Sequence, residues 1–115
     1  MLTNQGTGFI KQEDFPAEEV EPGITRQLLG YDNHLMMARV TFKKGAIGYV
    51  HTHAHRQVSF VEKGSFEVEI DGEKKVLRAG DAYFIPPNVP HGATALEDGV
   101  LVDVFTPCRE DFLAR

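Results

Sequence analysis

The sequence predicts an all-β protein, a single domain that is a β-sandwich or barrel of the jelly-roll type. Two observations carry this prediction. Short apolar runs follow one another at regular spacing and are separated by turns that contain glycine, which is typical of antiparallel sandwiches and barrels. No stretch shows a long apolar repeat with the period of an amphipathic helix. A chain of 115 residues has the usual length of one domain.

The strands are expected where apolar or alternating runs lie between turn signals. In chain order these runs are residues 24–29, 35–42, 58–61, 66–70, 74–78, 82–85, 91–96 and 100–105. The run at 66–70 alternates apolar and acidic side chains, which predicts one buried and one solvated face. The clearest turn is Asp71-Gly72, because both residues tolerate the positive φ of a type I′ hairpin. The segment from Pro86 to Pro90 cannot be a central strand, because proline lacks the donor of a sheet ladder.

Both ends of the chain are expected to lie outside the barrel or sandwich, which would span residues 24–106. Residues 1–23 are polar and acidic and contain Pro16 and Pro22, so they would form an N-terminal arm or an edge strand. Residues 107–115 would form a C-terminal tail with a short helix, because Pro107 is tolerated in a first helical turn.

The composition excludes several classes of function. The formal net charge is −5, whereas binding of nucleic-acid phosphates needs a basic surface, so no nucleic-acid partner is expected. No apolar run reaches membrane-spanning length, and the N-terminal segment lacks the apolar core of a signal peptide. We therefore expect a cytoplasmic protein with no membrane partner. Cys108 is the only cysteine, which leaves no internal disulfide and no thiolate cluster.

Four potential metal ligands lie in or after the most distinctive stretch of the chain, residues 45–64. His51 and His53 are two residues apart, so on a strand their side chains would share one face and chelate one ion. Gln57 follows a short turn and would face back from the next strand, and His91 lies where a proline-stiffened turn enters another strand. We therefore predict a divalent metal site formed by these four residues, with nickel, zinc, manganese and iron as candidate metals.

The spacing of these residues resembles the two sequence motifs of the cupin superfamily. The first motif is G-x5-H-x-H-x3-Q-x6-G over residues 45–64, and the second is G-x5-P-x4-H over residues 80–91. The resemblance implies a cupin jelly-roll β-barrel with a metal held by three histidines and a carboxylate. The chain departs from this pattern at the carboxylate, where Gln57 stands, and at Asn88 and Ala95, which replace a glycine and an asparagine.

The neutral amide of Gln57 has a chemical consequence. Three imidazoles and an amide leave the full charge of a divalent ion uncompensated, so the site should favour an anionic ligand and act as a Lewis acid. Stabilising a higher oxidation state is a less obvious use of such a site. His55 lies in the turn between the ligands, and we expect it to support them or to face solvent.

The segment 100–109 contains an aspartate among apolar neighbours. The valines at positions 100, 102 and 104 would form one face of a strand, expected to point into the core, and Asp103 lies on the other face. Burying an aspartate is unfavourable unless the group is paired or used. Either Asp103 forms a salt bridge with an arginine, or it is a general acid and base while Arg109 binds a substrate carboxylate through two hydrogen bonds.

Most of the chain after Gly30 resembles the KdgF family of small cupins. The matching segments are LMM at 35–37, the set of histidines and glutamine at 51–57, YFIPPNVPHG at 83–92 and LEDGVLVDVFTPCREDF at 96–112. The resemblance implies conversion of 4,5-unsaturated monouronates, released by lyases from pectin or alginate, to linear 5-keto-4-deoxyuronate. It implies that the metal ligands are His51, His53, Gln57 and His91. It also implies that Asp103, Phe105 and Arg109 are needed for activity.

Two other functions would suit the same barrel. One is a metal-dependent dioxygenase or lyase that acts on a small organic acid, and oxygen consumption would distinguish the dioxygenase. The other is a non-catalytic cupin that binds a sugar acid, in which Asp103 would have no evident purpose. The uronate hypothesis is preferred because only it uses the whole segment 96–112. The expected partners are a small anionic sugar acid and a second copy of the chain, in a homodimer formed through the outer sheet or by exchange of N-terminal strands.

Overall fold

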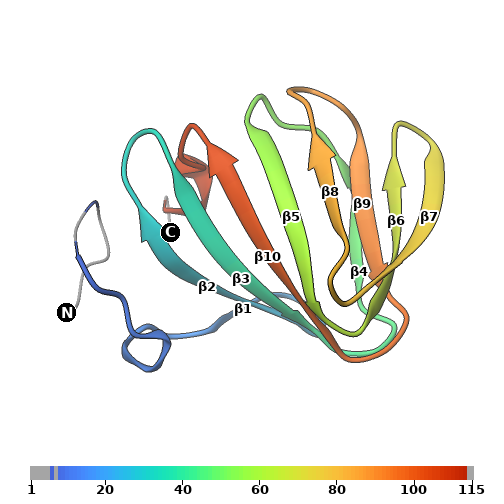
Figure 1. The fold of residues 1–115 in the computed structure, drawn as a ribbon, viewed down its shortest axis with the longest axis horizontal. Coiled ribbons are helices and arrows are strands. Elements are labelled where there is room, and N and C mark those ends of the chain that lie inside the picture. Colours follow the sequence, from blue (N-terminus) through green and yellow to red (C-terminus); the bar gives the residue numbers. More distant parts are fainter. Residues whose placement is uncertain (1–5, 7, 114–115) are drawn as a thin grey trace.

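The computed structural model describes residue 6 and residues 8–113, which form strands joined by short loops (Figure 1). The strands are β1 (Glu18–Glu21), β2 (Ile24–Tyr31), β3 (Met36–Phe42), β4 (Ile47–His51), β5 (Arg56–Lys63), β6 (Ser65–Ile70), β7 (Glu73–Arg78), β8 (Ala82–Ile85), β9 (His91–Ala95) and β10 (Gly99–Thr106). Two short 3-10 helices flank them, η1 (Gln12–Asp14) and η2 (Glu110–Phe112). The predicted all-β class is therefore confirmed.

The strands form two antiparallel sheets that enclose the interior of the barrel (Figure 1). The six-stranded sheet has the order β1-β2-β3-β10-β5-β8, and the four-stranded sheet has the order β4-β9-β6-β7. Strands that are distant in the sequence become neighbours, since β10 lies between β3 and β5, and β9 lies between β4 and β6. This arrangement is the predicted jelly roll, with the chain crossing repeatedly from one sheet to the other.

The hydrophobic core lies between the two sheets. Its largest fully buried apolar side chains are Phe66, Phe105, Met36, Ile85 and Val61. Phe42 of β3 and Phe66 of β6 come from opposite sheets and pack edge to face, with ring centroids 5.1 Å apart. Phe66 and Val68 are buried, so the alternation predicted for this strand is confirmed.

Two of the predicted turns have different outcomes. Asp71 and Gly72 join β6 to β7 with φ values of 50° and 84°, so the predicted hairpin is confirmed. The turn expected between the apolar runs 24–29 and 35–42 begins later, because β2 continues through Tyr31. A register shift between Leu28 and Gly30 lets β2 bend and remain paired with β3, which a propensity argument could not foresee.

The two faces of β10 are reversed relative to the sequence-based expectation. Val102 and Val104 lie opposite Phe60 and Val58 of β5, whose side chains are 47% and 42% exposed, so this valine face points outward. Only the first valine of β10 is buried. The face that carries Asp103 lines the interior instead. Both faces of this strand are apolar, so alternation alone could not tell which one the core would take.

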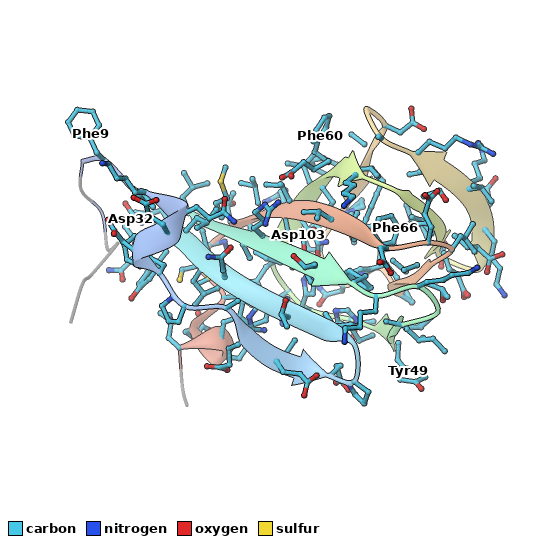
Figure 2. All side chains as sticks on the ribbon, turned by 90° about the horizontal axis from the view of Figure 1, so that it is seen from below. Phe9, Asp32, Tyr49, Phe60, Phe66 and Asp103 are labelled. Carbon is cyan, nitrogen blue, oxygen red and sulfur yellow. The ribbon has the colours of Figure 1, made fainter. Side chains whose placement is uncertain are left out.

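The two ends of the chain pack beside the barrel. The arm returns as an edge strand, in which β1 pairs with β2. Figure 2 shows Phe9, which precedes that strand, pointing away from the body of the molecule. The expected C-terminal helix is limited to the single turn η2, whose Phe112 packs edge to face on Phe105 with centroids 5.5 Å apart. Across residue 6 and residues 8–113, no helix is long and apolar enough to cross a membrane.

Candidate metal centre and active site

Three histidines converge where β4 and β9 pair, with His51 exposed, His53 half-buried and His91 buried. His51 ends β4 and lies directly opposite His91, which begins β9. His53 lies in the loop after β4, so the expectation that it shares a strand with His51 is wrong. The loop nevertheless brings its ring to within 4.7 Å of the His91 ring, centroid to centroid. One ring nitrogen from each histidine lies within 4.8 Å of the others, a spacing that could hold a metal ion.

Backbone carbonyls determine which nitrogen each histidine presents. In all three, Nδ1 lies at hydrogen-bond distance from a backbone oxygen. The pairs are His51 with Tyr49 at 2.8 Å, His53 with His55 at 2.9 Å and His91 with Val89 at 2.9 Å. A carbonyl can only accept, so Nδ1 carries the proton and Nε2 of the neutral ring keeps a free lone pair. This arrangement of the outer nitrogen is typical of histidines that bind metals.

The electrostatic setting keeps the rings of His53 and His91 neutral. Burial lowers the pKa of His91 to about 4. The pKa of His53 is also lowered, first by burial and then by the positive charge of Arg109. Both rings are therefore unprotonated near neutral pH, as metal binding requires. His91 Nε2 is buried and has no hydrogen-bond partner among the described residues, which is unfavourable unless another group occupies the space it faces.

Gln57 completes the arrangement from β5. Its Oε1 lies 3.0 Å from His53 Nε2, while its Nε2 donates a hydrogen bond of 2.9 Å to the Ser59 hydroxyl. With the His53 proton on Nδ1, two lone pairs face each other across the 3.0 Å contact. A cation bound by both atoms would remove this repulsion. The orphaned nitrogen of His91 and this contact both fit a divalent ion with three imidazole nitrogens and one amide oxygen as donors.

Close backbone packing supports this corner of the barrel. A Cβ added to Gly92 would lie 2.8 Å from the Gly48 carbonyl oxygen and 3.0 Å from the Val50 nitrogen. Glycine is therefore needed for β9 to lie against β4 next to the histidines. In the turn before His91, Asn88 adopts a φ of 65°, which asparagine tolerates better than most residues.

A cavity of about 510 Å³ opens over the histidines and extends between the two sheets. Its lining includes the candidate residues His51, Gln57, His91, Asp103, Phe105 and Arg109. A second hollow of about 630 Å³ is lined by residues of the N-terminal arm and Gln27. The amide of Gln27 there binds the backbone oxygens of Gln12 and Phe15, which fastens the arm. His51 and His91 line only the first of these two spaces, so the site lies in it.

Asp103 projects into this cavity from the middle of β10, and its label lies near the middle of the molecule in the view of Figure 2. Its carboxylate accepts a hydrogen bond of 2.6 Å from the Ser59 hydroxyl. Burial raises the pKa of Asp103 to about 6, although the Ser59 hydrogen bond and the charge of Arg109 both oppose the rise. A carboxyl group with a pKa near 6 can release and accept a proton close to neutral pH. The carboxylate of Asp103 is held by a hydroxyl group, so the alternative of a salt bridge with an arginine is not the arrangement in the structure.

Arg109 is almost buried beside Asp103 but is paired with another carboxylate. Its Nε and one terminal nitrogen donate hydrogen bonds of 2.9 and 2.8 Å to the two carboxylate oxygens of Asp111. Its guanidinium lies 4.2 Å from the Phe112 ring centroid and 5.1 Å from that of Phe105. The two-pronged geometry expected for a substrate carboxylate is therefore formed within the protein, with Asp111 as the acceptor.

Phe105 and His55 border the site. Phe105 is fully buried and meets the His53 ring edge to face, with centroids 5.8 Å apart. His55 acts through its backbone oxygen, which accepts from His53, while its ring lies 3.9 Å from the Glu110 carboxylate. Of the two positions expected for His55, the structure has the one beside the histidine cluster rather than the one facing solvent.

Sequence reasoning missed Ser59, Asp111 and Phe112, which contact the predicted residues. Ser59 shares the inward face of β5 with Gln57, so the alternation of that strand was the signal that could have found it. Asp111 lies two residues after Arg109, but nothing in its spacing distinguishes a partner from an ordinary surface acid.

Comparison with known proteins identifies the family. The sequence pattern of the cupin domain matches residues 38–105. The chain is 48% identical over 107 residues to the pectin degradation protein KdgF of Dickeya dadantii (strain 3937), covering 91% of this chain and 97% of that protein. The crystal structure of an RmlC-like cupin from Shewanella frigidimarina superposes with a TM-score of 0.91 at 47% identity, over 96% of this chain and 99% of that one. KdgF from Halomonas sp. superposes with a TM-score of 0.89 at 41% identity, over 92% and 98% of the two chains. The chain therefore belongs to the cupin family and, within it, to the KdgF proteins.

Proposed function

We propose that this protein is a metal-dependent enzyme of pectin or alginate breakdown that opens the ring of 4,5-unsaturated monouronates to give linear 5-keto-4-deoxyuronate. The observation that carries the proposal is that three clustered histidine nitrogens lie at a cavity that the Asp103 carboxyl and the Arg109 guanidinium also line. The 48% identity to a protein named for pectin degradation supports the choice of an unsaturated uronate as substrate.

The reaction needs proton transfer but no oxidant. The substrate is a cyclic hemiacetal whose ring oxygen is also an enol-ether oxygen next to a carboxylate. Removing the proton of the anomeric hydroxyl forms the C1 aldehyde, and the bond from C1 to the ring oxygen breaks. The electrons pass to the ring oxygen as an enolate, and a proton delivered to C4 gives the 5-ketone. Substrate and product are isomers, so one proton leaves oxygen and one reaches carbon.

The residues of the cavity match these requirements. Asp103 can accept the hydroxyl proton and deliver one to C4, because its pKa of about 6 suits both directions near neutral pH. Arg109 supplies positive charge beside Asp103 and beside the space for an anionic substrate. The buried ring of Phe105 forms an apolar wall. His51, His53, Gln57 and His91 would hold a divalent ion, for which nickel, zinc, manganese and iron are candidates. When bound, that ion supplies Lewis-acid stabilisation of negative charge on substrate oxygens.

The test follows the ultraviolet absorbance of the conjugated enol ether in unsaturated galacturonate. We expect the protein to accelerate the loss of absorbance over the uncatalysed reaction, a chelator to abolish the acceleration and added metal to restore it. Asp103→Asn should lower the rate by about 100-fold or more with metal still bound. A rate near that of the unaltered protein would exclude Asp103 as the acid and base. Oxygen uptake during turnover would instead indicate a dioxygenase.

We also propose a cytoplasmic homodimer that forms through the outward face of the six-stranded sheet. Met37, Val104, Val58 and Phe84 lie side by side across four neighbouring strands on this face. Met37, Val58 and Phe84 are 41%, 42% and 57% exposed in the single chain. A contiguous exposed apolar surface of this kind is more often covered by another protein molecule than left in contact with solvent.

A further inference from the structure

A continuous line of hydrogen-bonding groups runs from the histidines to Asp103. Ser59 lies at its centre, 1% exposed, on the inward face of β5. In the register of the sheet it is directly opposite Asp103 of β10 and Tyr83 of β8. Its hydroxyl contacts the Gln57 amide at 2.9 Å and the Asp103 carboxylate at 2.6 Å.

The number of available protons sets the direction of these bonds. A hydroxyl group has one proton to donate and can accept through its lone pairs. A carboxylate only accepts, so Ser59 must direct its single proton to Asp103. Ser59 can then only accept from Gln57, and the end of the amide that faces it must be the NH2 group. The other end, Oε1, is therefore turned toward His53 and the other histidines.

This orientation matters because the two ends of an amide have opposite chemistry. The oxygen is a ligand for cations, whereas the NH2 group donates hydrogen bonds and carries partial positive charge. An amide is nearly symmetric in shape, so packing alone does not select one end over the other. A glutamate at this position would present an oxygen to the metal in either orientation, because both of its oxygens are acceptors.

We propose that Ser59 is a positioning residue of the metal site. Because Ser59 donates its only proton to Asp103, it accepts a hydrogen bond from the NH2 group of Gln57, and the amide oxygen of Gln57 is thereby turned toward the metal. The inference rests on the metal site of the proposed function and adds a residue to it. It also assigns a second task to Asp103, separate from proton transfer. Groups that orient metal ligands in this way typically change metal affinity by about 10- to 100-fold when they are removed.

The test is a double-mutant cycle read by calorimetric titration of Zn²⁺ into chelator-treated, dialysed protein. Ser59→Ala in the otherwise unaltered chain should raise the Zn²⁺ Kd by about 10- to 100-fold. Ser59→Ala combined with Gln57→Glu should raise the Kd by less than about threefold relative to Gln57→Glu alone, because a carboxylate needs no orientation. Ser59→Thr, which keeps the hydroxyl, should bind more tightly than Ser59→Ala. Thermal unfolding checks that each variant is folded.

The outcomes separate the two proposals. If Ser59→Ala weakens binding equally in both backgrounds, the residue acts only through packing and the inference is wrong. If Ser59→Ala weakens Zn²⁺ binding in neither background, Ser59 does not orient the Gln57 amide and the inference is also wrong. The proposed metal site is not affected by that result. If the unaltered protein does not bind Zn²⁺ or Ni²⁺, the proposed metal site fails and the inference fails with it. Should Ser59→Ala not fold, Ser59→Cys replaces it, since a thiol fills the space but is a weak donor and acceptor.

Discussion

Replacing Asp103 by asparagine should make the metal-free protein more stable, and the size of the gain should depend on pH. Burial raises the pKa of this carboxyl from its ordinary value of 3.8 to about 6. As the pH rises between these two values, the unfolded chain releases the proton while the folded chain retains it. The folded state therefore loses stability over this interval and recovers none of it at higher pH. Asparagine has nearly the same shape, does not ionise and can still accept from Ser59.

The magnitude follows from the pKa shift. About two pKa units correspond to about 3 kcal/mol in total, most of which falls between about pH 4 and pH 8. The stability of Asp103→Asn relative to the unaltered protein should therefore increase by about 2–3 kcal/mol over this range. Urea unfolding of both proteins in the presence of a chelator, at several pH values, measures this difference directly.

Asp111 provides a control of opposite sign. The hydrogen bonds from Arg109 lower the pKa of Asp111, so this carboxyl contributes stability above its unfolded pKa and loses it on acidification. Asp111→Asn should thus be most destabilising near neutral pH, with a modest effect because the side chain is 58% exposed. If the stability curves of Asp103→Asn and the unaltered protein run parallel from about pH 4 to pH 8, the interior does not disfavour the Asp103 charge and the reasoning is refuted.

Three further predictions concern the metal, the backbone and the surface. His91→Ala should lower Zn²⁺ affinity by more than about 100-fold in a calorimetric titration, and an unchanged Kd would exclude His91 as a ligand. Gly92→Ala should reduce the free energy of unfolding in urea by about 1–3 kcal/mol and weaken Zn²⁺ binding, because the added methyl group would press on the backbone of β4. An unchanged free energy of unfolding would show that β9 can move away from β4 without cost, and would contradict this prediction. Phe60→Glu, on the outward face of the six-stranded sheet, should convert a dimer to a monomer in sedimentation at micromolar concentration without loss of Zn²⁺ binding. A monomer before mutation would contradict the proposed dimer.

Much of the fold could be predicted because its signals are local. Alternation in residues 66–70 and the Asp71-Gly72 turn depend on neighbouring residues, and both agree with the structure. The inward face of β10 could not be predicted in the same way. Both of its faces are apolar, and the choice depends on the outward residues of β5, which are adjacent only after the sheet has formed.

The candidate site likewise has features that the local sequence predicts and features that depend on the folded chain. The histidines and Gln57 could be named from their spacing, but the carbonyls that direct each Nε2 inward depend on loop conformations. The contact between Ser59 and Asp103 joins residues 44 positions apart through the register of β5 and β10. Arg109 was expected to bind a substrate carboxylate, but the structure pairs it with Asp111, a local contact that spacing did not single out.

The most direct test of the central claim is the nuclear magnetic resonance spectrum of the product formed from unsaturated galacturonate in D2O. Ring opening by proton transfer predicts linear 5-keto-4-deoxyuronate with one deuterium at C4, formed faster than in a control without protein and only when metal is bound. Deuterium-free product, an oxidised or shortened product, or a rate equal to that of the control would contradict the account.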